Sequence, residues 1–144
     1  MKTRNGTVKS YVLDTSAFFT LIEDEDGADL VQDLLQQAQR GEIKILASFV
    51  SFVEMFYITL QEKGEDEANT RIELMKRLAI ERVESSEEIG NIAGKMKAAH
   101  KISFADAWIA ATAKFYQAVL VHKDPEFEQV QDEVELLQLP YKVT

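Results

Sequence analysis

Four acidic residues stand where an α/β protein would place a catalytic or metal-binding centre. Asp14 ends the apolar run SYVLD (10–14), and Asp124 ends AVLVHKD (118–124). Asp106 lies in the first turn of the expected helix 103–118, and Glu54 is the single charged residue of ILASFVSFVEMFYITL (45–60). Carboxylates that converge on one cleft cannot all ionise without a compensating charge, which Mg²⁺ or Mn²⁺ supplies through oxygen ligands. The four acids therefore predict a metal site suited to phosphodiester hydrolysis, in which metals deprotonate a water and stabilise the attacking and leaving oxygens.

Each aspartate also has a purely structural interpretation. Asp14 could cap a helix beginning near Ser16, and Asp124 stands directly before a proline, as helix caps often do. Ser103 and Asp106 have the spacing of a capping box, although Glu or Gln is usual at the second position. Taken singly, each aspartate fits a cap at least as well as a ligand.

Glu54 has the weakest structural interpretation of the four. It lies within an expected helix over 48–64, and an unpaired carboxylate in apolar surroundings is costly. A basic residue three or four positions away would relieve that cost, but these positions hold Val50, Ser51, Tyr57 and Ile58. Glu54 therefore favours the joint interpretation, in which all four acids share a metal site.

Strands and helices alternate along the whole chain. Hydrophobic periodicity and turn residues predict strands at 10–14, 42–48, 80–85, 118–124 and 134–139. They predict helices at 16–23, 28–41, 48–64, 65–79, 86–101 and 103–118, with one or two helical turns at 125–131. The alternation indicates an α/β domain with a mostly parallel sheet. Ligands of such sheets bind outside the carboxyl ends of the strands, where Asp14 and Asp124 stand.

Length and composition restrict the class of protein. The 144 residues indicate one domain, 1–144, with polar residues 1–8 as a flexible tail. The absence of cysteine excludes disulfides, thiolate zinc sites and thiol catalysis. No run approaches the roughly 18 uncharged apolar residues of a membrane span, and no cleavage pattern follows YVLDTSAFFTLI. We expect a soluble, cytoplasmic protein that does not associate with membranes.

The charge distribution argues against a general nucleic-acid-binding module. The net charge is −9, whereas such modules normally show a basic stripe. An enzyme that meets phosphates through bound cations is not excluded. Basic residues gather in two segments, which we interpret as solvated helix faces: Arg71, Lys76, Arg77 and Arg82, and Lys95, Lys97, His100 and Lys101.

Apolar side chains at helical spacing give candidate core positions. The expected helix 65–79 offers Ile72, Leu74, Met75 and Leu78, and the helix 103–118 offers Trp108, Ile109 and Phe115. On the Glu54 helix, the aromatic side chains could belong to the core or line a groove for a partner helix: Phe49, Phe52 and Phe56.

Several segments resemble, in order and spacing, the PIN domain and, among its members, the toxins of VapC type. They are YVLDTSAFF (11–19), the isolated Glu54, ISFADAWIAATA (102–113) and AVLVHKDPEFE (118–128), and the resemblance covers about residues 10 to 139. SFADAWIAATA is its most specific part. The resemblance implies a PIN-like three-layer α/β/α sandwich with a central, mostly parallel sheet of four to five strands. It also implies a Mg²⁺- or Mn²⁺-dependent ribonuclease whose carboxylates are Asp14, Glu54, Asp106 and Asp124.

The resemblance further implies supporting hydroxyl groups, matched here by Ser16 or Thr15 and by Ser103. One position departs from the family pattern, because many members carry Thr two residues before the last acid and this chain has His122. Two interpretations of His122 stay open: it donates a hydrogen bond to the acid or the phosphate, or it only ends a strand.

The partners implied by the resemblance are an RNA substrate and an antitoxin protein. We also expect a homodimer, with residues 65–79 and 86–101 as the surfaces involved. Two alternatives remain: a PIN nuclease of RNA processing without an antitoxin, and a non-catalytic interaction domain that kept the fold.

Overall fold

The computed structural model describes residues 8–143, so the expected tail lies outside the described residues except for Val8. The strands are β1 (Ser10–Leu13), β2 (Lys44–Ser48), β3 (Glu81–Val83), β4 (Val119–His122) and β5 (Leu136–Gln138). The helices are α1 (Thr15–Ile22), α2 (Ala28–Gln39), α3 (Phe49–Lys63), α4 (Glu65–Arg77), α5 (Glu87–Ala99), α6 (Phe104–Phe115) and the 3₁₀ helix η1 (Pro125–Val130). These elements match the predicted ones within a few residues at each end.

The five described strands form one parallel sheet in the order β3-β2-β1-β4-β5. Val12 of β1 pairs with Leu46 of β2 on one side and with Leu120 of β4 on the other. From β1 the chain builds outward through β2 to β3, then returns to the other side of β1 with β4. The change of direction falls between β1 and β4, which is where parallel sheets bind their ligands.

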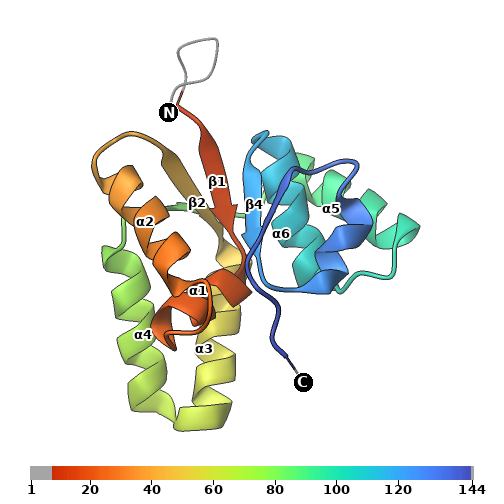
Figure 1. The fold of residues 1–144 in the computed structure, drawn as a ribbon. Coiled ribbons are helices and arrows are strands. Elements are labelled where there is room, and N and C mark those ends of the chain that lie inside the picture. Colours follow the sequence, from red (N-terminus) through yellow and green to blue (C-terminus); the bar gives the residue numbers. More distant parts are fainter. Residues whose placement is uncertain (1–7, 144) are drawn as a thin grey trace.

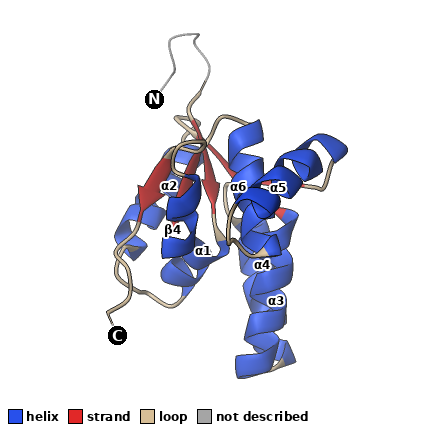
Figure 2. Ribbon diagram, turned by 90° about the vertical axis from the view of Figure 1, so that its right-hand side faces the viewer, coloured by secondary structure: helices blue, strands red, loops and turns tan. Residues whose placement is uncertain are grey.

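Helices cover both faces of the sheet, as Figures 1 and 2 show. Val12, Leu46 and Leu120 belong to the core beneath α5 and α6. Leu13 and Val121, one position along their strands, belong to the core beneath α1 and α2, because successive strand residues point to opposite faces. The expected three-layer α/β/α sandwich with a parallel central sheet is confirmed.

Helix α3 starts at the carboxyl end of β2 and pairs with α4. Ser48 ends β2 and caps α3, since its Oγ accepts a 3.1 Å hydrogen bond from the Val50 N–H. Gly64, with φ of +92°, reverses the chain into α4. The resulting helix pair extends beyond the edge of the sheet in Figure 2. Glu54 lies on α3 of this pair.

Three predictions about burial were wrong. Leu74 and Phe115 are exposed, because helical spacing gives the period of a face but not its width. Arg71 is buried instead of solvated, since α4 turns it toward the end of α1, where Glu23 pairs with it at 3.4 Å. Glu67 of the same helix α4 also pairs with it, at 3.3 Å. No helix in the described part of the chain has the length and apolarity needed to cross a membrane.

Candidate metal and active site

The carboxyl ends of β1 and β4 bring the first and last predicted acids to one edge of the sheet. Asp14 follows β1 directly, and its backbone N–H donates a 3.0 Å hydrogen bond to the Val121 carbonyl of β4. Asp124 follows β4 by two residues and caps η1, accepting from the Glu126 N–H at 2.9 Å. Asp106 reaches the same edge from the first turn of α6.

Asp14 is both a helix cap and a buried acid. Its Oδ2 accepts from the Ser16 N–H at 3.0 Å and from the Ser16 hydroxyl, so the capping interpretation holds. The residue is only 3% exposed, and Oδ1 is buried without a hydrogen-bond partner among residues 8–143. Burial raises the pKa of Asp14 to about 6, although the bonds from Ser16 oppose the rise. An oxygen left unpaired in such a place is free to accept a cation.

Asp106, Asp124 and Glu126 form a compact acidic group in the described part of the chain. One carboxylate oxygen of each lies within 4.8 Å of the others. The pKa of Asp106 rises to about 9, first because of burial, then because of its hydrogen bond with Glu126 and the negative charges of Asp14, Glu126 and Asp124. Without a cation, the pair Asp106 and Glu126 therefore retains a proton at neutral pH.

Glu126 is not among the predicted site residues. Its Oε1 also accepts a 2.5 Å hydrogen bond from the Ser103 N–H, which joins η1 to the start of α6. A signal for it exists in the sequence: it stands two residues after Asp124, behind the helix-starting Pro125. The tight turn that follows carries both carboxyl groups to the same side.

Glu54 lies at the side of the site nearest Asp14. Its Oε1 accepts a 2.6 Å hydrogen bond from the Thr15 hydroxyl, and its charge contributes to the raised pKa of Asp14. Thr15 Oγ1 is also 3.0 Å from Ser51 Oγ, so α1 and α3 are linked at this point. The partner that Glu54 lacks within its own helix is thus a hydroxyl group on α1.

The other predicted supporting residues hold the backbone around the acids. Ser16 Oγ accepts from the Lys123 N–H at 2.9 Å, and Ser103 Oγ caps α6 by accepting from the Asp106 N–H at 3.1 Å. His122 is buried, and its Nδ1 accepts from the Asp124 N–H at 3.1 Å. Burial lowers the pKa of His122, which favours the neutral ring. Its Nδ1 fixes the backbone of Asp124 through this hydrogen bond.

The arrangement fits a hard divalent cation. The group consists of carboxylates only, whose oxygens Mg²⁺ and Mn²⁺ prefer. The raised pKa of Asp106 and the unpaired Oδ1 of Asp14 both favour a positive charge at this place.

Comparisons with known proteins agree with this geometry. Residues 11–133 match the model of the PIN domain family. No curated protein sequence is significantly similar to the chain.

Solved structures with the same fold cover most of the chain. VapBC2 from Rickettsia felis, bound to a promoter DNA fragment, gives a TM-score of 0.75 at 18% identity over 91% of this chain and 99% of its own. VapBC-1 from nontypeable Haemophilus influenzae gives 0.69 at 23% identity over 90% and 97%. The Mycobacterium tuberculosis toxin VapC20, described as cleaving the sarcin–ricin loop, gives 0.66 at 15% identity over 83% and 94%. Because the family model spans most of its length, the chain belongs to the PIN domain family.

Proposed function

We propose that the chain is a Mg²⁺- or Mn²⁺-dependent endoribonuclease and the toxin of a VapBC-type toxin–antitoxin pair. The observation that carries the proposal is the group Asp106, Asp124 and Glu126, with Asp14 and Glu54 beside it, at the switch point of the sheet. The similarity to VapBC structures and to an RNA-cleaving toxin supports the choice of reaction and substrate.

In this proposal Asp106, Asp124, Glu126 and Asp14 are the candidate ligands. A divalent cation held there would lower the pKa of a water and neutralise charge on the phosphate oxygens. Asp106 must release its proton when it becomes a ligand, since metal-binding carboxylates are deprotonated. Glu54, next to Asp14, is placed to accept a proton from the attacking water or to complete the ligand set.

Ser16, Thr15, Ser103 and His122 act in this proposal as positioning residues. Ser16 holds one oxygen of Asp14 and leaves the other open, and Thr15 orients Glu54. His122 fixes the backbone before Asp124. Such supporting contacts commonly alter metal affinity or activity by about 10- to 100-fold when they are removed.

An exposed apolar stripe supports a protein partner. Val53, Tyr57 and Leu60 lie on one face of α3, at helical positions i, i+4 and i+7, and all three are exposed. Two of the three aromatic residues for which the sequence left core or groove open contact the core, because Phe52 is buried and Phe49 packs edge-on against Trp108. An amphipathic helix of an antitoxin would bury this stripe, and its position on the Glu54 helix would let the partner cover the acids.

The test is cleavage of single-stranded RNA by the purified chain. We expect cleavage with Mg²⁺ or Mn²⁺, none in EDTA, and a loss of roughly 100-fold or more in Asp106→Asn, because several kcal/mol of transition-state stabilisation depend on the cation. Cleavage that persists in EDTA or in Asp106→Asn would overturn the proposal. For the toxin assignment, the product of an adjacent reading frame should bind the chain and suppress cleavage, and an enzyme without such a partner would point to RNA processing.

A further inference from the structure

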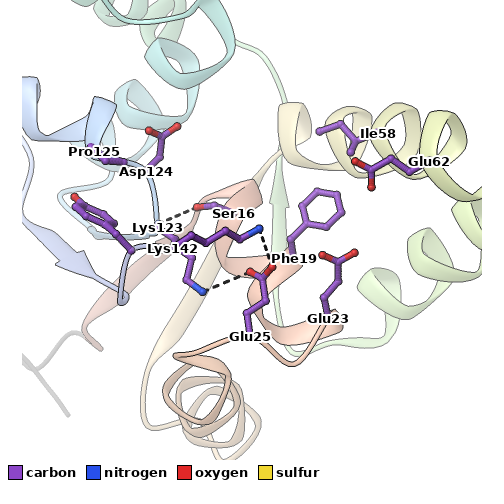
Figure 3. A pocket seen from close by; sticks show the side chains of 11 residues that line it. Ser16, Phe19, Glu23, Glu25, Ile58, Glu62, Lys123, Asp124, Pro125 and Lys142 are labelled. Atoms are coloured by element: carbon purple, nitrogen blue, oxygen red, sulfur yellow. Dashed lines mark hydrogen bonds and ion pairs between the residues drawn. The ribbon is translucent and has the colours of Figure 1, made fainter. Parts of the chain in front are cut away.

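A pocket of about 430 Å³ opens directly beside the acidic site, and Figure 3 shows the side chains that line it. Its walls come from α1, the turn after α1, α3, the segment between β4 and η1, and the C-terminal segment. Ser16 and Asp124 line the pocket and also belong to the acidic site. A molecule bound at the acids would therefore extend into the pocket, whose volume suits a single nucleotide.

Two lysines share one carboxylate in this pocket. Lys123 Nζ lies 3.4 Å from Glu25 Oε1, and Lys142 Nζ lies 2.9 Å from Glu25 Oε2. These three side chains together carry one more positive charge than negative. Glu23, which also lines the pocket, is paired with the buried Arg71 at 3.4 Å. Glu62 and Asp124 also line the pocket, so its walls carry four acids and two lysines. With Lys123 kept on Glu25, Lys142 is the lysine of the lining that is available to an incoming anion.

The two lysines differ in their freedom to move. The Lys123 side chain is 4% exposed, and its backbone N–H is bound to Ser16 Oγ. The Lys142 side chain is 70% exposed and rotates without disturbing the core. Lys142 can thus leave Glu25 for an incoming anion, while Lys123 continues to neutralise Glu25.

The fold holds the segment that carries Lys142 in place. The Leu139 N–H donates a 2.7 Å hydrogen bond to the His122 carbonyl, and the Tyr141 hydroxyl donates one of 2.7 Å to Glu128 Oε2. Gly27, with φ of +102°, permits a close approach, since a Cβ there would lie 3.1 Å from Pro140 Cδ. The chain after β5 is therefore led back to the acidic edge of the sheet.

The pocket also offers apolar surface suited to a base. Phe19 and Ile58 line it from α1 and α3, and Figure 3 shows the Phe19 ring between these helices. Bases of single-stranded RNA stack on aromatic rings of this kind. Glu62 is the remaining acid of this wall and is exposed to solvent.

We propose that this pocket binds the nucleotide next to the scissile phosphate of single-stranded RNA, with Lys142 on its phosphate and Phe19 against its base. The proposal rests on the ribonuclease function proposed above. The nucleotide must be unpaired, because a base inside a duplex cannot leave its stack to enter the pocket without losing its pairing.

Binding can be measured without cleavage in the Asp106→Asn background, in EDTA, with a fluorescently labelled single-stranded RNA of eight nucleotides. Asn keeps the shape of the Asp106 side chain and removes a candidate metal ligand, so RNA binding is measured without cleavage. We compare Lys142→Gln, Phe19→Leu and the control Lys114→Gln by fluorescence anisotropy at several salt concentrations. Lys114 is likewise a partly exposed lysine paired with a glutamate, at the end of α6 opposite to Asp106.

Lys142→Gln is expected to weaken binding about threefold to tenfold and to reduce the slope of log affinity against log salt by about 0.7, the value for one phosphate contact in a single strand. Phe19→Leu should weaken binding by about tenfold with an unchanged slope, because stacking releases no counterions. Lys114→Gln should change neither quantity. If Lys142→Gln and Phe19→Leu both match Lys114→Gln, the pocket does not bind RNA and the proposal is overturned.

This failure is distinguishable from failure of the ribonuclease proposal. Metal-dependent cleavage by the wild-type chain, together with unchanged binding in both pocket variants, would overturn the subsite alone. Absence of both RNA cleavage and RNA binding in every variant would overturn the subsite and the ribonuclease function together.

Discussion

The Ser103 N–H donates its hydrogen bond to Glu126 Oε1 at 2.5 Å and not to the Asp106 carboxylate three residues further along α6. In a capping box, the acid three residues after the cap takes this bond. Because Glu126 takes it from η1, Asp106 is not needed as a cap and its carboxyl group meets Asp124 and Glu126 instead. This hydrogen bond therefore joins η1 to the start of α6 and leaves the Asp106 carboxylate available to the acidic site.

Glu126 is therefore predicted to have two separable roles. Glu126→Gln keeps an oxygen for the Ser103 N–H but removes a charge, so the pKa of Asp106 should fall toward its ordinary value. We expect melting of the metal-free protein to be nearly unchanged and RNA cleavage to fall by tenfold or more. Glu126→Ala should lose cleavage equally and also melt earlier, since a backbone N–H loses its partner at a cost of about 1–3 kcal/mol.

NMR titration of the side-chain carboxyl carbons measures the pKa of Asp106, and thermal melts measure the stability of each variant. Glu128→Gln is a control on the same helix, and its side chain lies outside the acidic group. An Asp106 pKa that stays near 9 in Glu126→Gln would contradict the first role.

Stability of the metal-free protein is predicted to fall as pH rises. In the unfolded chain Asp14 and Asp106 titrate near 3.8, whereas the folded chain holds their protons to about 6 and about 9. The folded state therefore binds more protons across this window, and the stability they contribute is complete below about pH 3.8 and lost as pH rises toward 9. Asp106→Asn removes the larger part of this dependence.

Thermal melts in EDTA at pH 4, 7 and 9 test this directly. The melting temperature of Asp106→Asn relative to wild type should be similar at pH 4 and progressively higher at pH 7 and 9. Asp132→Asn, at an exposed turn, serves as the control. A difference between Asp106→Asn and wild type that does not depend on pH would refute the raised pKa.

The sequence predicted the layered fold well, because its signals are local and repeated. Buried strands such as SYVL and VLVH stand between helices with clear caps and glycine stops, so both period and boundaries are visible. The placement of Asp14 at a strand end follows from the same rules. What local signals do not contain is the pairing of side chains from distant elements.

Glu126 and Thr15 illustrate that limit. Glu126 contacts Ser103 across 23 residues and Thr15 contacts Glu54 across 39, so neither contact leaves a periodic trace in the sequence. Arg71 likewise looks like a surface charge in the sequence, and only the fold shows that it pairs with Glu23, 48 residues away. Packing of separate elements determines these contacts, and a single sequence does not display it.

Ser16 is predicted to control the affinity of the site for metal. Its hydroxyl donates to Asp14 and accepts from the Lys123 N–H, so it fixes Asp14 against β4. In Ser16→Ala the pKa of Asp14 should rise further, because a bond that lowers it is gone. Metal affinity should fall by about 10- to 100-fold, and Ser16→Thr should restore most of it.

Calorimetric titration with Mn²⁺ measures this effect, with the exposed Ser85→Ala as the control. Equal Mn²⁺ affinity in Ser16→Ala and wild type would show that Asp14 needs no such support.

The proposed homodimer is predicted to depend on the exposed apolar surface of α4. Leu74 is exposed there, and an unpaired charge buried at an interface is unfavourable because it loses its hydration. Leu74→Glu should weaken association by tenfold or more while changing the melting temperature little, since exposed substitutions are usually within 0.5 kcal/mol. Sedimentation at micromolar concentrations checks the prediction, with Lys76→Glu on the same helix as a charge control. A wild-type chain that remains monomeric at high micromolar concentration would exclude the dimer.

Glu54 gives the sharpest distinction between a catalytic and a structural acid. Glu54→Gln keeps the shape of the side chain and an oxygen for the Thr15 hydroxyl at 2.6 Å, and it removes a charge that acts on Asp14. If Glu54 serves the metal site, the metal-free variant should be at least as stable as wild type, because repulsion is relieved. RNA cleavage should fall by tenfold or more, and the stabilisation conferred by Mn²⁺ should shrink, since that gain follows how tightly the folded state binds the ion.

If Glu54 is only structural, the variant should melt earlier and Mn²⁺ should protect it as fully as wild type. Melts of wild type, Glu54→Gln and the exposed control Glu73→Gln, with and without Mn²⁺, separate these outcomes, and an unchanged Mn²⁺ shift in Glu54→Gln would remove Glu54 from the metal site.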